Sequence, residues 1–226
     1  MRPLRTLLTS SPFLLLTVAA AAPARAQMPP PVASAQPGMT SIVERPGFDF
    51  GLRLGYALPM GSVAQNVDLS TGLSGAIPLV LEAAYRFTPN LSAGALFQYA
   101  IAQTKNCDPG ASCSASVVRI GIEGIYNMRM NTALDPWFGA GIGYEWLNIS
   151  ESGAGTNVDG DVHGFEFLTL QGGGDYRLAP QFALGPFVSF SIGQYATASS
   201  GSQSADIQNT AIHEWLQLGV RGTFNL

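Results

Sequence analysis

Apolar and polar residues alternate along most of the chain after residue 47. The segment 48–58 is the clearest case, because Phe, Leu and Tyr occupy every second position and Asp49 and Arg53 lie between them. Successive side chains of a strand point to opposite faces, so a period of two over this length predicts a β-strand and not a helix. The pattern returns seven more times, in segments 77–87, 91–103, 117–129, 138–146, 165–178, 182–193 and 216–224.

The sixth of these segments is the least regular. Phe165 and Phe167 are out of phase with Leu168 and Leu170, and a β-bulge near Glu166 would reconcile the two halves.

The length of the segments and of their connections distinguishes a soluble from a membrane sheet. Soluble strands usually run about 5–6 residues, whereas a tilted membrane strand needs about 9–11. Tight joins at 88–90, 131–133 and 179–181 alternate with longer polar stretches near 59–75, 105–115, 150–161 and 197–210. The sequence therefore predicts an all-β fold: an eight-stranded antiparallel up-and-down transmembrane β-barrel with short periplasmic turns and long extracellular loops.

The alternation also predicts which side chains face lipid. Charged side chains in lipid are costly, about 2–4 kcal/mol for an Arg at the bilayer midplane, so the apolar face points outward and the charged face into the lumen. An eight-stranded barrel is just wide enough for its side chains, so we expect the inward charges to pair with one another. The alternative is a gated polar path for small solutes, since the inward glycines leave room for water. The expected lumen charges are Asp49, Arg53, Glu82, Arg86, Arg119, Glu123, Glu145, Asp175, Arg177 and Arg221.

Aromatic residues near the strand ends predict two girdles at the membrane interfaces. Tyrosines just before the tight turns would form the periplasmic girdle. The other girdle would contain Tyr99, Tyr144, Trp146 and Tyr195.

The N-terminus has the features of an export signal. Arg2 and Arg5 precede a short apolar stretch at 13–22, and the small-x-small pattern ending at Ala26 predicts cleavage before Gln27. Residues 1–26 are therefore a predicted signal peptide. Residues 27–46 are rich in Pro and Ala and predict a flexible linker, and residues 47–226 form the predicted barrel domain.

Composition narrows the class of partner. The chain is 46% hydrophobic but only 12% charged, with a formal net charge of −4 and a single lysine, Lys105. Removal of the signal peptide leaves eight cations against fifteen acids, a net charge of −7. This composition, without any basic run, argues against nucleic-acid binding.

Two pairs of residues are candidates for chemistry. Cys107 and Cys113 lie in one predicted outer loop around a Pro-Gly turn, and in an oxidising compartment we expect them to form a disulfide. His163 and His213 lie near the outer ends of the sixth and eighth strands, where Glu214, Glu166 or a loop serine could complete a hydrolytic site. We expect polar interface roles for both histidines, and no catalytic, metal or cofactor site.

The alternating strands, the two Tyr-Arg-x-x-Pro turns and the closing segment 219–226 resemble the small outer-membrane β-barrel proteins, such as the OmpA barrel domain, OmpX and OmpW. The resemblance covers residues 48–226. It implies an outer-membrane location, contact with membrane lipid and lipopolysaccharide, and recognition of the C-terminal strand by the barrel-assembly machinery. In this chain Phe224 and Leu226 would supply that assembly signal, although the family usually ends in an aromatic residue.

Three functions stay open at this point. The first is a non-enzymatic barrel with a structural role in the envelope or a role in small-solute passage. The second is a binding or adhesion surface for an extracellular ligand, formed by the long loops. The third is an enzyme that modifies lipid A, as some eight-stranded barrels do.

Overall fold

In the computed structural model, the described residues are 46–107, 110–128, 134–153, 156–201 and 203–226. The predicted signal peptide with its cleavage position at Ala26 and Gln27, the linker up to residue 45, and the predicted turn at 131–133 lie outside these residues. These three expectations therefore stay predictions.

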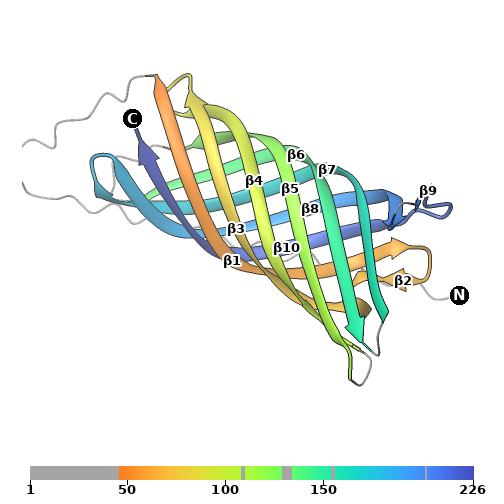
Figure 1. The fold of residues 1–226 in the computed structure, drawn as a ribbon. Coiled ribbons are helices and arrows are strands. Elements are labelled where there is room, and N and C mark those ends of the chain that lie inside the picture. The colour runs from red at the N-terminus through yellow and green to blue at the C-terminus, as the bar shows by residue number, and fades with distance from the viewer. Residues whose placement is uncertain (1–45, 108–109, 129–133, 154–155, 202) are drawn as a thin grey trace, which may run out of the picture. The chain divides into compact units, whose positions relative to one another are not determined.

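Eight long strands form a closed antiparallel barrel (Figure 1). Each strand pairs with the next along the chain, and the last strand pairs with both its predecessor and the first, so the ring has no open edge. The predicted eight-stranded up-and-down barrel is confirmed. The strands are β1 (Gly47–Ala64), β3 (Leu73–Arg86), β4 (Leu91–Thr104), β5 (Ser112–Asn127), β6 (Leu134–Gly153), β7 (Thr156–Ala179), β8 (Phe182–Ser200) and β10 (Ile212–Asn225).

The two ends of the barrel differ. At one end, which we call the turn end, β1 begins, β10 ends and short turns join β3 to β4 and β7 to β8. At the other, the loop end, the chain adds the short strands β2 (Val67–Asp68) and β9 (Gln203–Asp206) and one helical turn, α1 (Leu69–Gly72). No helix in the described ranges is both long and apolar enough to span a bilayer.

The strands run farther into the loop end than the sequence predicts. Most of the expected loop at 150–161 is strand, because β6 and β7 stay paired from Asn148–Asp161 to Gly153–Thr156. Likewise β1 continues to Ala64 and β8 to Ser200. Hydrophobic alternation ends where the outer face no longer has to be apolar. Backbone pairing does not depend on this alternation, so the strands continue beyond it. The predicted long loops are therefore largely projecting hairpins.

The bulge predicted near Glu166 is confirmed by the pairing of β6 with β7. Gly141 faces Thr169 and Gly143 faces Glu166, so β7 carries one extra residue over this interval. As a result Phe165, Phe167, Leu168 and Leu170 are all exposed on the outer surface despite their change of phase.

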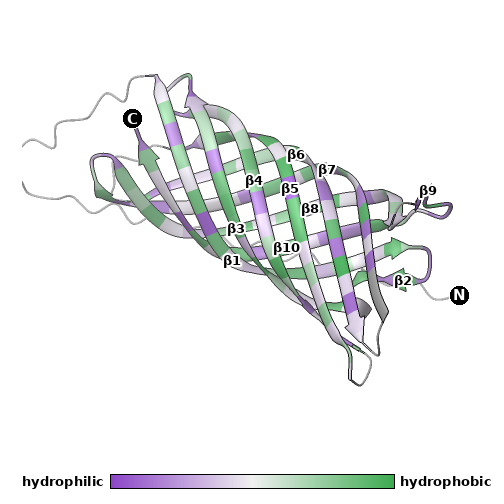
Figure 2. Ribbon diagram, viewed as in Figure 1, coloured by the Kyte–Doolittle hydropathy of each residue, from purple (hydrophilic) through white to green (hydrophobic). Residues whose placement is uncertain are grey.

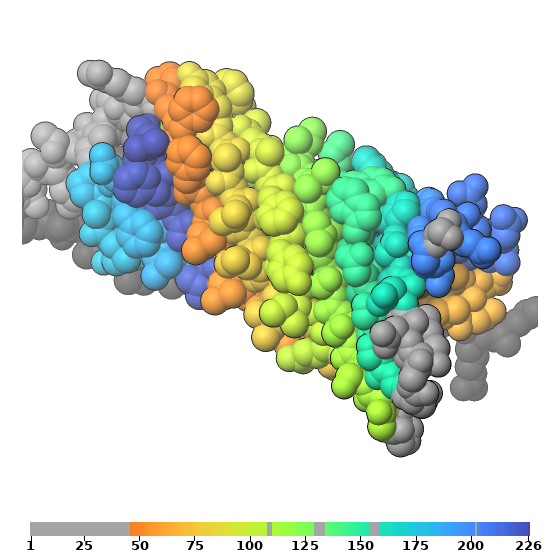
Figure 3. All heavy atoms as spheres, in the orientation of Figure 1, coloured from red at the N-terminus to blue at the C-terminus, as the bar shows by residue number. Residues whose placement is uncertain are grey.

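The outer surface of the barrel is apolar. Hydrophobic and polar residues alternate along each strand (Figure 2), and the exposed members are large aliphatic and aromatic side chains such as Leu54 and Ile122. In the space-filling view the atoms of β1 to β7 form a continuous surface across the visible face (Figure 3). Apolar outside and polar inside is the arrangement of a membrane barrel, the reverse of a soluble one.

An outward charge in the middle of a strand tests this orientation. Ile122 of β5 is 61% exposed, and Ile122→Arg should lower the free energy of unfolding in lipid vesicles by about 2–4 kcal/mol, because the guanidinium would lie in hydrocarbon. A denaturant titration that follows folded and unfolded bands by gel mobility measures the change. The matched control is Ala205→Arg in β9 at the loop end, which should cost much less; equal costs would contradict the assigned outer face.

Candidate functional site

The turn-end half of the lumen holds a network of paired charges centred on Arg53 of β1. Its Nη2 lies 3.2 Å from both carboxylate oxygens of Glu123 on β5, and Nη1 donates to Gln171 on β7. The Nε of Arg53 contacts Glu82 on β3. Gln171 donates in turn to Glu123 at 2.8 Å. One guanidinium thus joins four strands, and its planar fork suits several acceptors at once.

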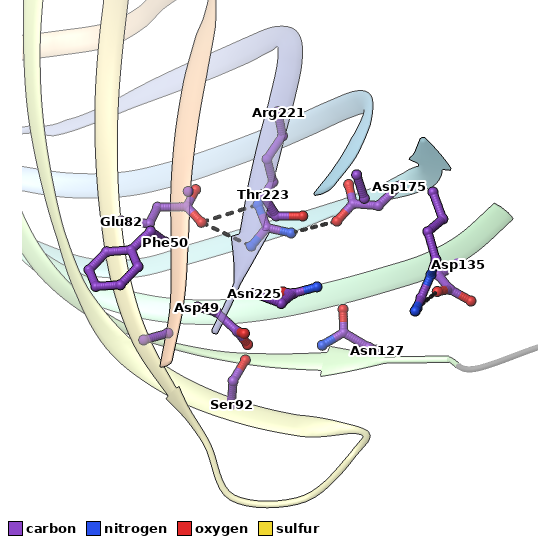
Figure 4. Close-up of a pocket in the computed structure, with 14 residues that line it drawn as sticks. Asp49, Phe50, Glu82, Ser92, Asn127, Asp135, Asp175, Arg221, Thr223 and Asn225 are labelled. Carbon is purple, nitrogen blue, oxygen red and sulfur yellow. Dashed lines mark hydrogen bonds and ion pairs between the residues drawn. The ribbon is translucent and has the colours of Figure 1, made fainter. Parts of the chain in front are cut away.

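Arg221 of β10 forms the second centre of this network. Its Nη2 lies 2.9 Å from Glu82 and its Nη1 3.0 Å from Asp175 of β7, and Figure 4 shows Arg221 between these two carboxylates. The guanidinium carbon also lies 4.4 Å from the ring centroid of Trp137 on β6, whose indole donates to Asp175 at 3.0 Å. Aromatic stacking and ion pairing therefore hold the same cation.

A second cluster lies nearer the loop end, around Glu145 of β6. Arg119 of β5 donates to Glu145 at 2.7 Å and lies 2.7 Å from Glu166 of β7. The other oxygen of Glu145 accepts from the Tyr195 hydroxyl and, at 3.1 Å, from the indole of Trp215. Every one of these residues is buried. The carboxylate therefore exchanges water for donors on three other strands, which offsets the cost of burying its charge.

Tyr195 corrects one expectation. It was expected in the outer aromatic girdle, but it is 0% exposed and lies inside the lumen, stacked on the ring of His213 at 4.0 Å between centroids. Gly193 makes this stack possible, since a Cβ there would lie 2.9 Å from Cε1 of His213. Inward positions of β8 are odd-numbered, so the alternation continued to residue 195 already placed this side chain inside.

The contacts described above cross the lumen. In the ring β6 is the strand opposite β1, yet the guanidinium carbon of Arg53 lies 5.5 Å from the Trp137 ring on β6. Trp215 on β10 likewise reaches Glu145 on β6, three strands away around the ring. Side chains from facing walls therefore meet in the middle, at two levels along the axis.

Beyond the Glu145 cluster the lumen becomes apolar. Ala57, Ala76, Ala100, Ala115 and Val117 line the wall, and Trp215 and Tyr195 pack with them. The helical turn α1 contributes Leu69, which is almost fully buried against Leu73 and Leu147. The loop end of the lumen is thus closed by a hydrophobic cluster, a feature absent from the expectation of a uniformly polar interior.

The turn end of the lumen opens into a cavity of about 40 Å³ (Figure 4). Asp49 and Arg86 pair there at 2.9 Å, and Arg177 and Asp135 pair at 2.8 Å near the mouth. A single water needs about 10–15 Å³, so the cavity has room for a few waters and is too small for an organic solute.

The structure places all ten expected lumen charges on the inner side of the wall. Eight of them are buried, and Asp49 and Arg177 lie at the partly open mouth. The sequence reasoning missed the roles of Trp137, Gln171, Tyr195, His213 and Trp215. The sequence does contain a signal for the two tryptophans. Each directly precedes an outward-facing residue, so strand alternation assigns it to the inner face.

The two histidines do not share a site. Nε2 of His213 lies 3.5 Å from Glu145, whereas Nδ1 of His163 lies 3.0 Å from Asp161. Among the described residues, neither histidine forms a hydrogen bond or ion pair with Glu214 or Glu166, the partners a hydrolytic site would have used. Cys107 and Cys113 are joined by a disulfide. No three His, Cys, Asp or Glu side chains of the described ranges are arranged to hold a metal ion.

Comparison with solved structures supports the fold. The barrel is similar to a major outer membrane protein from Thermus thermophilus, with a TM-score of 0.52 and 11% identity over 79% of this chain and 99% of that one. It is also similar to Neisserial surface protein A, at TM-score 0.45 and 17% identity over 76% and 95% of the chains. The outer membrane protease OmpT from Escherichia coli gives a TM-score of 0.47 at 6% identity over 80% and 97%. No family model and no curated protein sequence matches the chain.

The likeness to the Thermus protein shows the fold alone, that of an outer-membrane β-barrel. One fold can carry different activities, so the function of this barrel depends on its lumen and its loop end.

Removing one partner of the Glu145 cluster tests its contribution. Arg119→Met should lower the free energy of unfolding by about 3–5 kcal/mol, because it leaves two buried carboxylates without their cation. Denaturant titration in lipid vesicles measures it. Arg177→Met at the mouth is the matched control: this pair is partly exposed and should cost about 1 kcal/mol or less. If both substitutions cost the same, the buried pairs are not what stabilises the lumen.

Proposed function

We propose that this protein is a non-enzymatic outer-membrane barrel whose closed lumen acts as a rigid core and whose hairpins project from the cell surface. The observation that carries this proposal is the contact of Arg53 and Trp137 across the lumen, from opposite strands of the ring. Facing walls that meet in the middle of the lumen, here through a guanidinium and an indole ring, favour a supporting role over that of a pore.

The outer-membrane location rests on three features. The barrel exterior is apolar and its strands are long enough to span a bilayer. The sequence begins with a predicted export signal. The structural neighbour from Thermus is described as an outer membrane protein. In this orientation the turn end faces the periplasm and the loop end faces outward.

Two features argue against solute passage and against catalysis. Passage of solutes would require the Arg53 and Glu145 contacts to break, together with the apolar cluster that closes the loop end. Catalysis by His213 would require access, yet this side chain is 2% exposed and stacked on Tyr195. A lumen without a path and a histidine without access support a structural and display role.

The closed lumen predicts an electrically silent protein. After refolding and insertion into a planar bilayer, the barrel should show no conductance steps in salt solution, because no continuous polar path crosses the apolar cluster. A general diffusion porin added afterwards to the same membrane controls for detection, and the gel mobility of an unheated sample controls for folding. Regular steps from the folded protein would overturn the closed-lumen proposal.

The orientation predicts where the single lysine can be reached. Lys105 is exposed at the loop end, and it is the only lysine of the chain. A membrane-impermeant amine reagent applied to intact cells should therefore label the protein at Lys105. Lys105→Arg should abolish the labelling at this position, since a guanidinium does not react with an amine reagent under the same conditions. Labelling only after cell lysis would contradict the assigned location or orientation.

A further inference from the structure

The loop end contains a cleft of about 470 Å³ that the closed lumen does not explain. It lies between the projecting part of β6 and the segment that joins β1 to β3. Leu69, Leu73 and Leu147 form its floor, and all three are almost fully buried in the apolar cluster. Val67 and Ile149 line it while remaining 54% and 43% exposed. A cleft of this size and lining falls in the range of small-molecule sites, about 300–1,000 Å³.

Membrane lipid does not account for the exposed apolar wall. Ile149 is in phase with Glu145 and Leu147, which both point toward the barrel axis, so its side chain is on the inner and not the lipid-facing side. Exposed apolar side chains gathered in a concave, water-facing place are typical of a binding site.

One side of the cleft is held in place by the hairpin that joins β4 to β5. The backbone N–H of Lys105 donates to Gly72 at 2.7 Å and its ammonium donates to the carbonyl of Ser70 at 3.2 Å. The amide of Asn106 donates to Thr71 at 3.2 Å, and the Cys107–Cys113 disulfide closes the hairpin. These bonds fix α1 against the hairpin, and a pre-formed cleft loses less entropy on binding.

The charge of the loop end favours a positive ligand. Asp68 and Glu151 line the cleft together with Lys105, so its lining carries one net negative charge, and the Lys105 ammonium is already bonded to the carbonyl of Ser70. In the described part of the chain the side chain of Glu151 makes no hydrogen bond or ion pair, whereas Lys105 is the only Lys or Arg of the loop end. The described carboxylates of this end include Asp68, Glu151, Asp159, Asp161 and Asp206. Their summed field raises the local concentration of cations.

We infer that this cleft binds a small organic cation with an apolar body. The apolar part would cover Val67 and Ile149, and the positive group would lie beside Glu151 at the rim. The inference goes beyond the closed-barrel proposal and requires only a folded loop end. The cleft can therefore fail to bind the cation while the lumen proves closed, and it can bind the cation while the lumen proves open.

Calorimetric titration of the full-length barrel in nanodiscs of zwitterionic lipid tests the site. The probe is benzyltriethylammonium, compared with tetramethylammonium, which lacks the apolar body, and with 4-tert-butylbenzenesulfonate, which carries the opposite charge. We expect saturable binding of benzyltriethylammonium, at least about tenfold weaker binding of tetramethylammonium because little apolar surface is buried, and no binding of the sulfonate.

Substitutions at the cleft separate the two contributions. Glu151→Gln should weaken binding of benzyltriethylammonium about fivefold and reduce its salt dependence, and Ile149→Ser should weaken it about tenfold. Asp206→Asn, the same kind of charge loss at the same end but away from the cleft, should leave the affinity within about twofold. Gel mobility of unheated samples verifies that each variant folds.

Three outcomes would overturn the inference. The first is binding of the sulfonate as tight as that of the cation. The second is equal loss of affinity in Glu151→Gln and Asp206→Asn, which would show a diffuse surface effect. The third is the absence of saturable binding of benzyltriethylammonium to the folded wild-type protein.

Discussion

Closure of the backbone ring is the constraint from which the other features follow. An apolar surrounding offers no partner to a free N–H or C=O, so a sheet in such a surrounding has to pair its first strand with its last. Here β1 and β10 do so over the whole stretch from Asp49–Asn225 to Gly61–His213. Once the ring is closed, strand alternation assigns every side chain to the inside or the outside. The apolar exterior and the charged interior are then two consequences of a single pattern.

The size of the ring decides what the inner charges do. With eight strands the facing walls are close enough for Arg53 and Arg119 to reach carboxylates on other strands. Each buried charge is costly unless it is paired and hydrogen-bonded, so the network is stable only as a set. Rings of Trp137 and Phe187 pack on the Arg53 guanidinium and exclude water from the same region. The same ion pairs and ring contacts therefore stabilise the wall and close the lumen.

Much of this architecture could be predicted from the sequence. The period-two pattern identified the strands, and its irregularity at Phe167 and Leu168 identified the bulge. The projecting hairpins were missed because strand pairing beyond the apolar band leaves no hydrophobic signature, as at Ser150–Asp159. The partners of Glu145 were missed for another reason. Which inner residues meet depends on strand stagger and tilt, and a pattern along one strand does not contain the register of strands across the ring.

In the proposed orientation, the single lysine at the loop end affects how the protein meets proteases outside the cell. Among the described residues of that end, Lys105 is the only position after which a protease specific for basic residues could cut. Its backbone N–H is bonded to Gly72, so the peptide does not lie free to enter a protease cleft in extended form. The described arginines, the other target of such enzymes, lie within the wall and at the opposite mouth. The distribution of basic residues thus leaves the projecting hairpins with almost nothing for these proteases to hydrolyse.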